Sequence, residues 1–555
     1  MHSSHVQLIQ RAILMFTFGV LALVVLLAPV AQAQLVNNLL VDGAAMSLGN
    51  AVTADPPKVN SIHYNAAGLT RLKGRHVSVS STFIYAQAST EFSAPADYRI
   101  FSSEDRDNNP ILNGTLKSKV TRADQNPVIL VPGGHSPLRP PKALPIPVGV
   151  LPGFGVSINP PGSKFTFANA SYLQLAGGTT MGDTNPLKYQ AQTQATMRFT
   201  YAAPAVAYEV NDRLSVGMSV GFNYHGVYTQ KRAVAPNMLG GMNEMIQDAL
   251  CGPPDDRQGF ALAFLYNPCG GNIGPFDESG TATIKMEDTL STHWTLGVLW
   301  QATDWMTIGV NYQSESEVEL AGTMDIEFRE DWYNYYRQYR QSLYGALNAD
   351  QFNTPHGLAR EQGNITMDMV YPQKLDIGVS FQITPRWKVN VDAHWMDWGV
   401  MDEFKINLDR DFEAFSAAMI LRFDIFRPNS TVSKVKFKST TSLAIGTEYT
   451  VNERLKLRFG IENRPDAVDD AFAPANAALA DTVLFGAGAE YQWDNESVME
   501  FYVTYFESER DLPANTSQNA NLDSLLNVST NPYAGLDIKS DLSVLMWGVK
   551  YTKQW

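Results

Sequence analysis

The chain has 555 residues and a formal net charge of -14 at neutral pH. So acidic a chain is a poor ligand for nucleic acid, which excludes the classes of protein that bind DNA or RNA through basic surfaces. Charged residues make up 18% of the chain and aromatic residues 11%, and the charged share is below the roughly 25% of soluble domains. The slightly negative mean hydropathy, -0.17, does not exclude a membrane protein, because the strands of a membrane β-barrel alternate apolar and polar residues whose hydropathies cancel.

Residues 1–33 are typical of a secretory signal peptide. Arg11 is their only charged residue, residues 12–30 are almost wholly apolar, and Ala31-Gln32-Ala33 forms a small-x-small cleavage site. The alternative is a transmembrane anchor, since the run is nearly long enough to span a bilayer. The cleavage site and the lack of charges after it favour removal. No second apolar run of that length follows, so helical spans are not expected in the mature chain.

The stretch Asp42–Leu72 has neither a strand period nor a helical one. It is rich in Ala, Gly and Asn and carries Pro56-Pro57 in its middle, as a linker would. A long array of alternating segments follows it. We therefore expect the strands to enclose this stretch.

Three short motifs stand out there, namely Leu48-Gly49-Asn50-Ala51, Ala54-Asp55 and Asn65-Ala66-Ala67-Gly68-Leu69. They resemble the N-terminal hatch of the outer-membrane long-chain fatty acid transporter family (FadL-type). The resemblance continues in Pro204–Tyr208, Trp294–Val298 and Leu455–Gly460. The family usually has Asn-Pro-Ala at the third motif. Ala66 stands where that proline would be, so the turn lacks the fixed φ that proline imposes.

The resemblance implies a hatch at residues 34–73 that plugs the barrel lumen. Asn65, Ala66, Ala67 and Gly68 would form its turn, in which Asn65 bonds nearby backbone and Gly68 matters if its φ is positive. It also implies that Leu35 and Val36 lie near a ligand pocket. An inward kink in the third strand, within Lys164–Gly178, would open a lateral route.

Alternating segments dominate residues 74–555. In Leu214–His225 the even positions are apolar and the odd ones small or polar, and the same period recurs in residues 306–313, 375–383 and 455–462. One such strand also fits a half-buried soluble sheet. Many of them, ending in aromatic residues, predict an all-β transmembrane antiparallel barrel.

Turn lengths predict the orientation of this barrel. Tight turns such as Asn211-Asp212 alternate with long stretches, the largest at residues 231–280 and 324–366. Short periplasmic turns and long extracellular loops are the outer-membrane pattern. Counting hairpins gives about fourteen strands, which is also the family's number. The chain ends on Trp555, like the aromatic last strand of outer-membrane proteins.

Cys251 and Cys269 lie in one of these long loops. In an exported protein we expect them to form a disulfide. Two cysteines without a nearby histidine do not indicate a metal site.

Both long loops contain apolar residues at helical spacing. The family's loops in these positions form an apolar groove at the cell surface, and Met-rich and aromatic surfaces suit an adaptable apolar ligand. The alternative is that these residues pack on the barrel rim or on each other. The candidates are Met238, Met242, Met245 and Ile246 in the first loop and Trp332, Tyr336 and Tyr339 in the second.

Two basic residues fall on the lumen-facing phase of their strands. Arg458 and Lys388 could each bind the carboxylate of a ligand inside the barrel. The alternative is that each pairs with a lumen carboxylate such as Asp392, Glu448 or Glu490.

Together these features predict a channel in the bacterial outer membrane for passive uptake of long-chain fatty acids or similar hydrophobic compounds. We expect a monomer in contact with outer-membrane lipid and lipopolysaccharide, with no cofactor and no enzymatic activity. The alternatives are a barrel-type lipid enzyme, for which no local nucleophile motif is present, and a surface adhesin or receptor, for which the long loops would suffice.

Overall fold

The computed structural model describes residues 38–95, 98, 111, 120–133, 141–145, 149–234, 237–253, 264–274, 277–348, 355–413, 426–427, 429–476, 480–522 and 532–555. The predicted signal peptide at 1–33 and the predicted pocket residues Leu35 and Val36 lie outside the described residues. Within the described ranges, no helix is both long and apolar enough to cross a membrane.

The described strands form a closed antiparallel β-barrel of fourteen strands, which confirms the predicted fold class. The first segment pairs with the last from His76↔Gln554 to Ser93↔Asp537, and this pairing closes the sheet. Several barrel strands are divided into two segments. The segments of the first half are β1 (Gly74–Ser93), β2 (Val120–Val131), β3 (Lys142–Pro145), β4 (Gly149–Asn159), β5 (Phe165–Thr180), β6 (Thr193–Ala202), β7 (Ala205–Asn211), β8 (Leu214–Val234), β9 (Glu278–Thr303), β10 (Met306–Gln313) and β11 (Ser316–Phe328).

The second half continues the same meander and ends on the closing strand. Its segments are β12 (Arg360–Tyr371), β13 (Lys374–Thr384), β14 (Trp387–Met396), β15 (Glu403–Leu408), β16 (Phe426–Arg427), β17 (Ser430–Lys434), β18 (Thr440–Thr450), β19 (Leu455–Arg464), β20 (Thr482–Gln492), β21 (Ser497–Leu512) and β22 (Asp537–Gln554).

Short helices occur before the first strand and in the long connections. They are α2 (Gly43–Ser47), η2 (Lys58–Asn60), α3 (Ser61–Tyr64), η3 (Ala66–Arg71), α5 (Lys188–Ala191), α6 (Asn237–Cys251), α7 (Glu330–Gln341), α8 (Leu343–Asn348), η6 (Trp398–Val400) and η7 (Asp470–Phe472).

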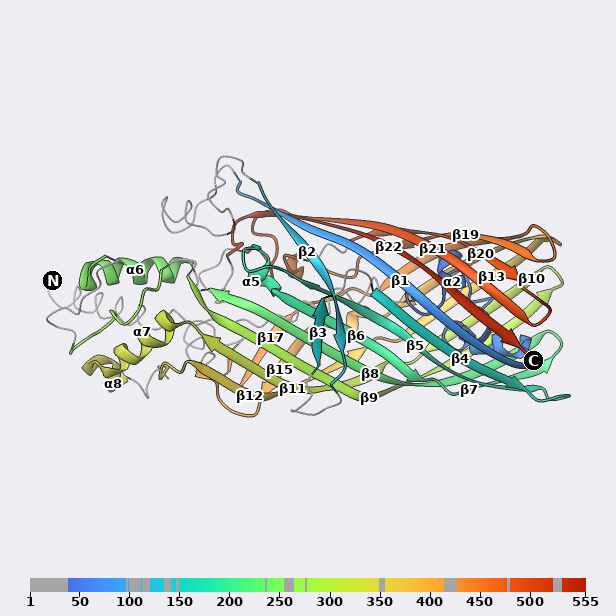
Figure 1. Ribbon diagram of the computed structural model, residues 1–555, viewed down its shortest axis with the longest axis horizontal. Coiled ribbons are helices and arrows are strands. Elements are labelled where there is room, and N and C mark those ends of the chain that lie inside the picture. Colours follow the sequence, from blue (N-terminus) through green and yellow to red (C-terminus); the bar gives the residue numbers. More distant parts are fainter. Residues whose placement is uncertain are drawn as a thin grey trace.

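The two ends of the barrel differ as the turn lengths predict. Tight turns lie at the end that carries the C-terminus, while α6, α7 and α8 lie beyond the opposite end (Figure 1). Strands continue further into the long connections than expected. β8 extends to Val234 and β11 to Phe328, because the alternating pattern persists above the apolar belt.

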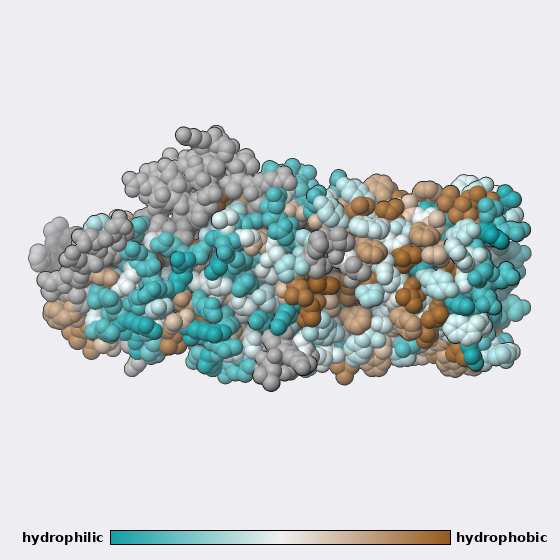
Figure 2. All heavy atoms as spheres, viewed as in Figure 1, coloured by the Kyte–Doolittle hydropathy of each residue, from teal (hydrophilic) through white to brown (hydrophobic). Residues whose placement is uncertain are grey.

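Period-two alternation builds that belt. Along β9, Trp294, Leu296 and Trp300 are exposed, whereas His293 and Thr295, in the alternate phase, are buried. Apolar residues gather over the half of the barrel nearer the C-terminus, with hydrophilic residues at the rim of that end and over much of the opposite half (Figure 2). Such a belt is what a membrane requires of the outer face.

Candidate transport pathway

Glycines on the inner face of the barrel show where the N-terminal segment, residues 38–72, lies. They alternate with exposed apolar residues such as Met218 and Phe459, so a Cβ built on them points into the lumen. At Gly217 it would meet the Ala66 carbonyl carbon at 2.4 Å, and at Gly460 the Leu48 carbonyl carbon at 1.9 Å. The backbone of the N-terminal segment therefore rests directly on the barrel wall, inside it.

The turn predicted at 65–68 is built around the Asn65 side chain. Its Nδ2 donates to the carbonyl oxygens of Thr53 at 2.9 Å and Val298 at 3.0 Å, and its Oδ1 accepts from the Ala67 N–H at 3.2 Å. Asn65 thus ties two parts of the N-terminal segment to a barrel strand. Ala66 begins the 3₁₀ helix that follows.

Gly68 has a different role from the one anticipated. Its φ is not positive, so backbone strain does not explain the residue. A Cβ here would instead lie 2.3 Å from Cγ of Pro56. Gly68 is required because the chain passes closely over Pro56.

Charged groups anchor the N-terminal segment to the wall. Asp42 pairs with Lys550 at 2.5 Å, and Asp55 pairs with Lys388 at 2.6 Å and Arg71 at 2.8 Å. Burial would raise the pKa of the Asp55 carboxyl, but the charges of Lys388 and Arg71 outweigh it and hold that pKa well below its ordinary value. Asp55 is therefore ionised, and its pairing persists at neutral pH.

Arg458 and Lys388, proposed from the sequence as carboxylate partners, both lie in this anchored region. Arg458 contacts Glu448 at 2.8 Å, Glu490 at 2.6 Å and Glu500 at 2.8 Å. Lys388 contacts Asp55 and, at 3.6 Å, Glu448. Both basic residues are thus paired with carboxylates of the protein, which agrees with the alternative that they bind lumen carboxylates rather than a ligand.

An apolar cavity of about 160 Å³ lies where the barrel wall is interrupted. The β4–β5 ladder reaches only Phe154↔Ser171, and β5 next pairs with β2 at Thr179. On its other edge this part of β5 pairs with β6, and a register shift in that pairing between Leu173 and Leu175 lies within the range expected to kink. The cavity is lined by Leu39, Leu40, Ile84, Ala86, Ala88, Gln125, Pro127, Val128, Ile129, Gly149, Leu151, Ala176, Gly177, Gly178, Thr179, Asn476, Phe506, Leu542, Val544 and Met546.

A β-hairpin covers the outer side of this interruption. β2 leaves the wall and pairs with β3 in a small separate sheet. Cβ atoms built on Gly178 and Gly226 would meet Val128 at 2.7 Å and Leu130 at 2.3 Å. Glu287 holds the hairpin by accepting from the Gly133 N–H at 3.0 Å, and it also accepts from the Tyr224 hydroxyl at 2.8 Å. The cavity is thus bounded by the N-terminal segment inside and by the hairpin outside.

Arg198 is a buried cation close to this cavity. It lies on β6 opposite Leu175, which directly precedes the cavity residue Ala176. Arg198 is fully buried, and its Cζ stacks 3.5 Å from the ring centroid of Tyr371. None of its side-chain nitrogens has a hydrogen-bond partner among the described residues, and none of them forms an ion pair there. A buried guanidinium without an anion is costly, so the site favours an anionic ligand.

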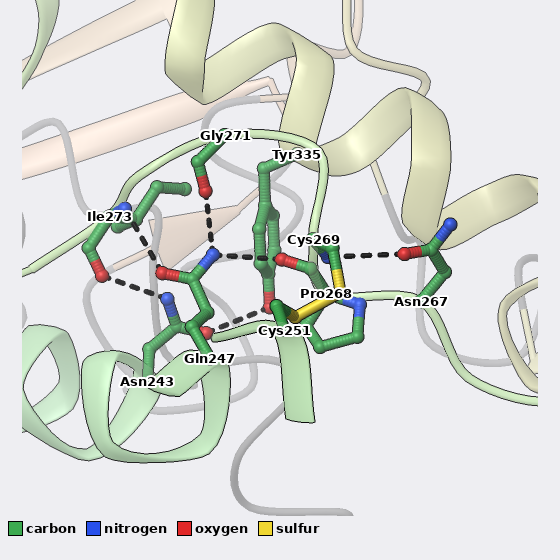
Figure 3. Close-up of a disulfide and its surroundings, with 9 residues drawn as sticks. All are labelled: Asn243, Gln247, Cys251, Asn267, Pro268, Cys269, Gly271, Ile273 and Tyr335. Carbon is green, nitrogen blue, oxygen red and sulfur yellow. Dashed lines mark hydrogen bonds between the residues drawn. A yellow bond between two sulfur atoms is a disulfide. The ribbon is translucent and has the colours of Figure 1, made fainter. Parts of the chain in front are cut away.

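The extracellular loops pack against each other through polar contacts. Tyr335 of the second loop donates to Asn243 Oδ1 of the first at 3.0 Å, and within the first loop Gln247 donates to the Gly271 carbonyl at 2.6 Å (Figure 3). Cys251 and Cys269 form a disulfide beside these contacts.

The predicted groove residues differ in exposure. Trp332, Tyr336 and Tyr339 are buried, so they do not line an open groove in this structure. Met245 is exposed and Ile246 half-buried. Met238 and Met242 belong to α6, but their side chains lie outside the described part.

A closed fourteen-stranded barrel with an apolar belt, tight turns at one end and long loops at the other defines a β-barrel of the bacterial outer membrane. The model of the family described as outer membrane protein transport protein (OMPP1/FadL/TodX) matches residues 22–555. The chain belongs to this family of outer-membrane transport proteins. No curated protein matches the sequence significantly.

Several solved structures share the fold. A Pseudomonas aeruginosa FadL homologue is 12% identical, with a TM-score of 0.63 over 93% of this chain and 98% of that one. The P. putida toluene transporter TodX is 15% identical, with a TM-score of 0.55 over 93% and 98%. The CymD monoaromatic hydrocarbon channel is 15% identical, with a TM-score of 0.54 over 94% and 99%. At such identities the likeness concerns the fold alone.

The sequence analysis missed Arg198 and most of the cavity. Both lie where the strand period is broken, since register shifts occur in β5 and in the β6–β8 pairing. A signal for Arg198 did exist. It is the only charged residue in the segment Thr193–Ala202.

Proposed function

We propose that this channel takes up long-chain fatty acids, or closely similar apolar carboxylates, by passive diffusion. The observation that carries the proposal is Arg198, a fully buried lumen cation without an acidic partner among the described residues. A carboxylate would complete a charge-assisted, bidentate contact there. A neutral hydrocarbon could not, and would leave the guanidinium unpaired.

The surroundings suit the rest of such a ligand. With its carboxylate at Arg198, an acyl chain can extend past Leu175 into the adjoining cavity, where Leu39, Leu40 and Val544 supply apolar contacts. Burial of methylene groups contributes about 0.8 kcal/mol each. The head therefore supplies selectivity and the tail supplies affinity.

We infer that residues 34–73 act as a hatch beneath this site. The many contacts of the N-terminal segment with the wall support a plug that closes the periplasmic half of the lumen. The interruption between β4 and β5, together with the apolar cavity inside it, supports a lateral exit into the membrane. Diffusion down a gradient through these two features needs no cofactor.

Two further properties belong to the proposal. The apolar belt supports a monomer surrounded by lipid and lipopolysaccharide. An enzymatic role has little support. His394 pairs with Asp376 at 2.9 Å, but Ser442, opposite His394 in the sheet, donates to Glu462 instead.

Growth of a host strain that lacks its own fatty acid channel tests the substrate. Cells producing the wild-type protein should grow on oleate, and cells producing Arg198→Ala should take up oleate at least about ten-fold more slowly, as expected for loss of one charge-assisted contact. Uptake of hexadecane by the two should be equal. Equal oleate uptake at matched surface expression would refute the carboxylate assignment.

A further inference from the structure

The inner face of β8 carries a second buried cation above Arg198. His225, opposite Arg198 in the sheet, is followed on the same face by Val227, Thr229 and Lys231. Lys231 is only 3% exposed. Lys231 lies six positions beyond His225, which places it about 20 Å further toward the extracellular end.

Lys231 has no hydrogen bond or ion pair with another described residue, unlike its outward neighbour. Arg232 pairs with Asp183 at 3.1 Å and also donates to Thr281 at 2.7 Å. An ammonium group in a nearly dry environment without an anion is unfavourable. Lys231 therefore carries the free-energy cost of a buried, unpaired charge, whereas Arg232 beside it is paired.

Other polar atoms between the two cations are also unpartnered. Thr229 Oγ1, His225 Nε2 and the Oε1 of Gln194, the residue opposite Thr229, are buried without a hydrogen-bond partner among the described residues. Buried polar atoms are normally satisfied. Their alignment with Lys231 and Arg198 forms a polar track, defined here as residues 194, 198, 225, 229 and 231.

The neighbouring strands offer a different surface. Ala282, opposite Lys231 on β9, is followed on the inner face by Ile284 and Met286. Met324 on β11 lies opposite Ile284. All are buried and belong to one apolar cluster. Unbranched methionine side chains adjust to a passing ligand more readily than branched ones do. A polar track beside an adaptable apolar wall matches an amphipathic chain with one anionic head.

We propose that Lys231 is a first binding position for the carboxylate of the substrate, from which the head moves along the polar track to Arg198. The inference rests on the proposed function and adds a second anion-binding residue to it. Lys231 acts on the rate at which substrate reaches the lumen site. Arg198 determines how tightly the substrate is held there.

Initial uptake rates of labelled oleate test the track. Lys231→Met should slow oleate uptake about ten-fold at low substrate concentration, the effect of one charge-assisted contact. Lys231→Arg should restore most of the rate, because it keeps the charge. Hexadecane uptake should be unchanged. Arg232→Met is the matched control, since it removes a neighbouring charge from the outer face.

Equilibrium binding separates this inference from the assignment of Arg198. Purified Lys231→Met protein should bind oleate nearly as tightly as wild type, while Arg198→Ala protein should not. Wild-type oleate uptake in Lys231→Met would overturn the track and leave Arg198 in place. Equal slowing of oleate and hexadecane would likewise overturn it, since it would indicate a packing defect.

Discussion

Two charged sites of the lumen, one in each half, differ in how their buried cations are paired. In the periplasmic half, Arg458 is surrounded by Glu448, Glu490 and Glu500, and the N-terminal segment adds further pairs. In the extracellular half, Arg198 and Lys231 are buried without an acidic partner among the described residues. Paired charges hold a segment in place. Unpaired charges leave a position for an anion that the chain itself does not supply.

We expect the largest effect from a variant in which the N-terminal segment can no longer pack against the inner wall of the barrel. Gly460→Leu would place side-chain atoms where Leu48 and Gly49 now lie. Overpacking of this kind costs about 1–3 kcal/mol or more, and we expect displacement of the segment. Single-channel conductance and sensitivity to large antibiotics should rise, while the barrel still migrates as a heat-modifiable band. Gly182→Leu, which meets no atom within 4 Å, is the control, and equal conductance in both variants would contradict the plug.

Removing one arginine from each half should have unlike consequences. Arg458→Met removes the three shortest ion pairs of Glu448, Glu490 and Glu500, which keep only lysine contacts at 3.1–3.7 Å. The loss should destabilise the protein by less than the roughly 3–5 kcal/mol of a wholly broken buried pair, and the temperature of unfolding should fall. Arg198→Met removes an unpaired charge and should leave that temperature unchanged or raise it. Thermal unfolding in detergent measures both, and equal losses would show that Arg198 has a structural partner.

Variants at Asn65 and Gly68 test whether the turn of the N-terminal segment contributes to transport. Asn65→Ala removes the hydrogen bonds to Thr53 and Val298 and leaves their carbonyls buried, at a cost of about 1–3 kcal/mol. Gly68→Val would force Pro56 aside. Both variants should assemble normally but take up oleate more slowly. Unaltered oleate uptake in both variants at matched expression would show that the turn does not contribute to transport.

The smallest effect concerns pH. Neighbouring cations hold the pKa of Asp55 well below its ordinary value, so its contribution to stability is complete above the ordinary carboxyl pKa and is lost only as the pH falls through the depressed one. The N-terminal segment should therefore stay seated at pH 5 and loosen only in strong acid. Protease accessibility of the segment across this range measures it, and release near pH 5 would contradict the pairing with Lys388.

The sequence predicted the regular parts of this protein well. Alternation in segments such as Leu214–His225 follows from a wall with one apolar and one polar face, so it is visible without coordinates. The inner glycines, Gly217 and Gly460 among them, carried a usable signal too, because small residues at inward positions mark where a segment approaches.

The site itself was hidden for physical reasons. Arg458 and Arg198 look alike as isolated basic residues in strands, and only their neighbours across the lumen distinguish them. Those neighbours come from strands far apart in sequence, such as Glu500 for Arg458 and Tyr371 for Arg198. The cavity depends on where the β4–β5 ladder stops, which no local pattern encodes. Trp332 and Tyr336 show that one aromatic pattern fits both a surface groove and a packed loop core, and their burial favours the packed core.

The most direct test of the central claim is the affinity of purified protein for oleate and for oleyl alcohol, which differ only in the head group. Wild-type protein should prefer oleate by at least about ten-fold, the effect of one charge-assisted contact. Arg198→Met should bind both equally, with its affinity for the alcohol unchanged. A preference for oleate that survives in Arg198→Met would contradict the claim and place the carboxylate elsewhere in the barrel.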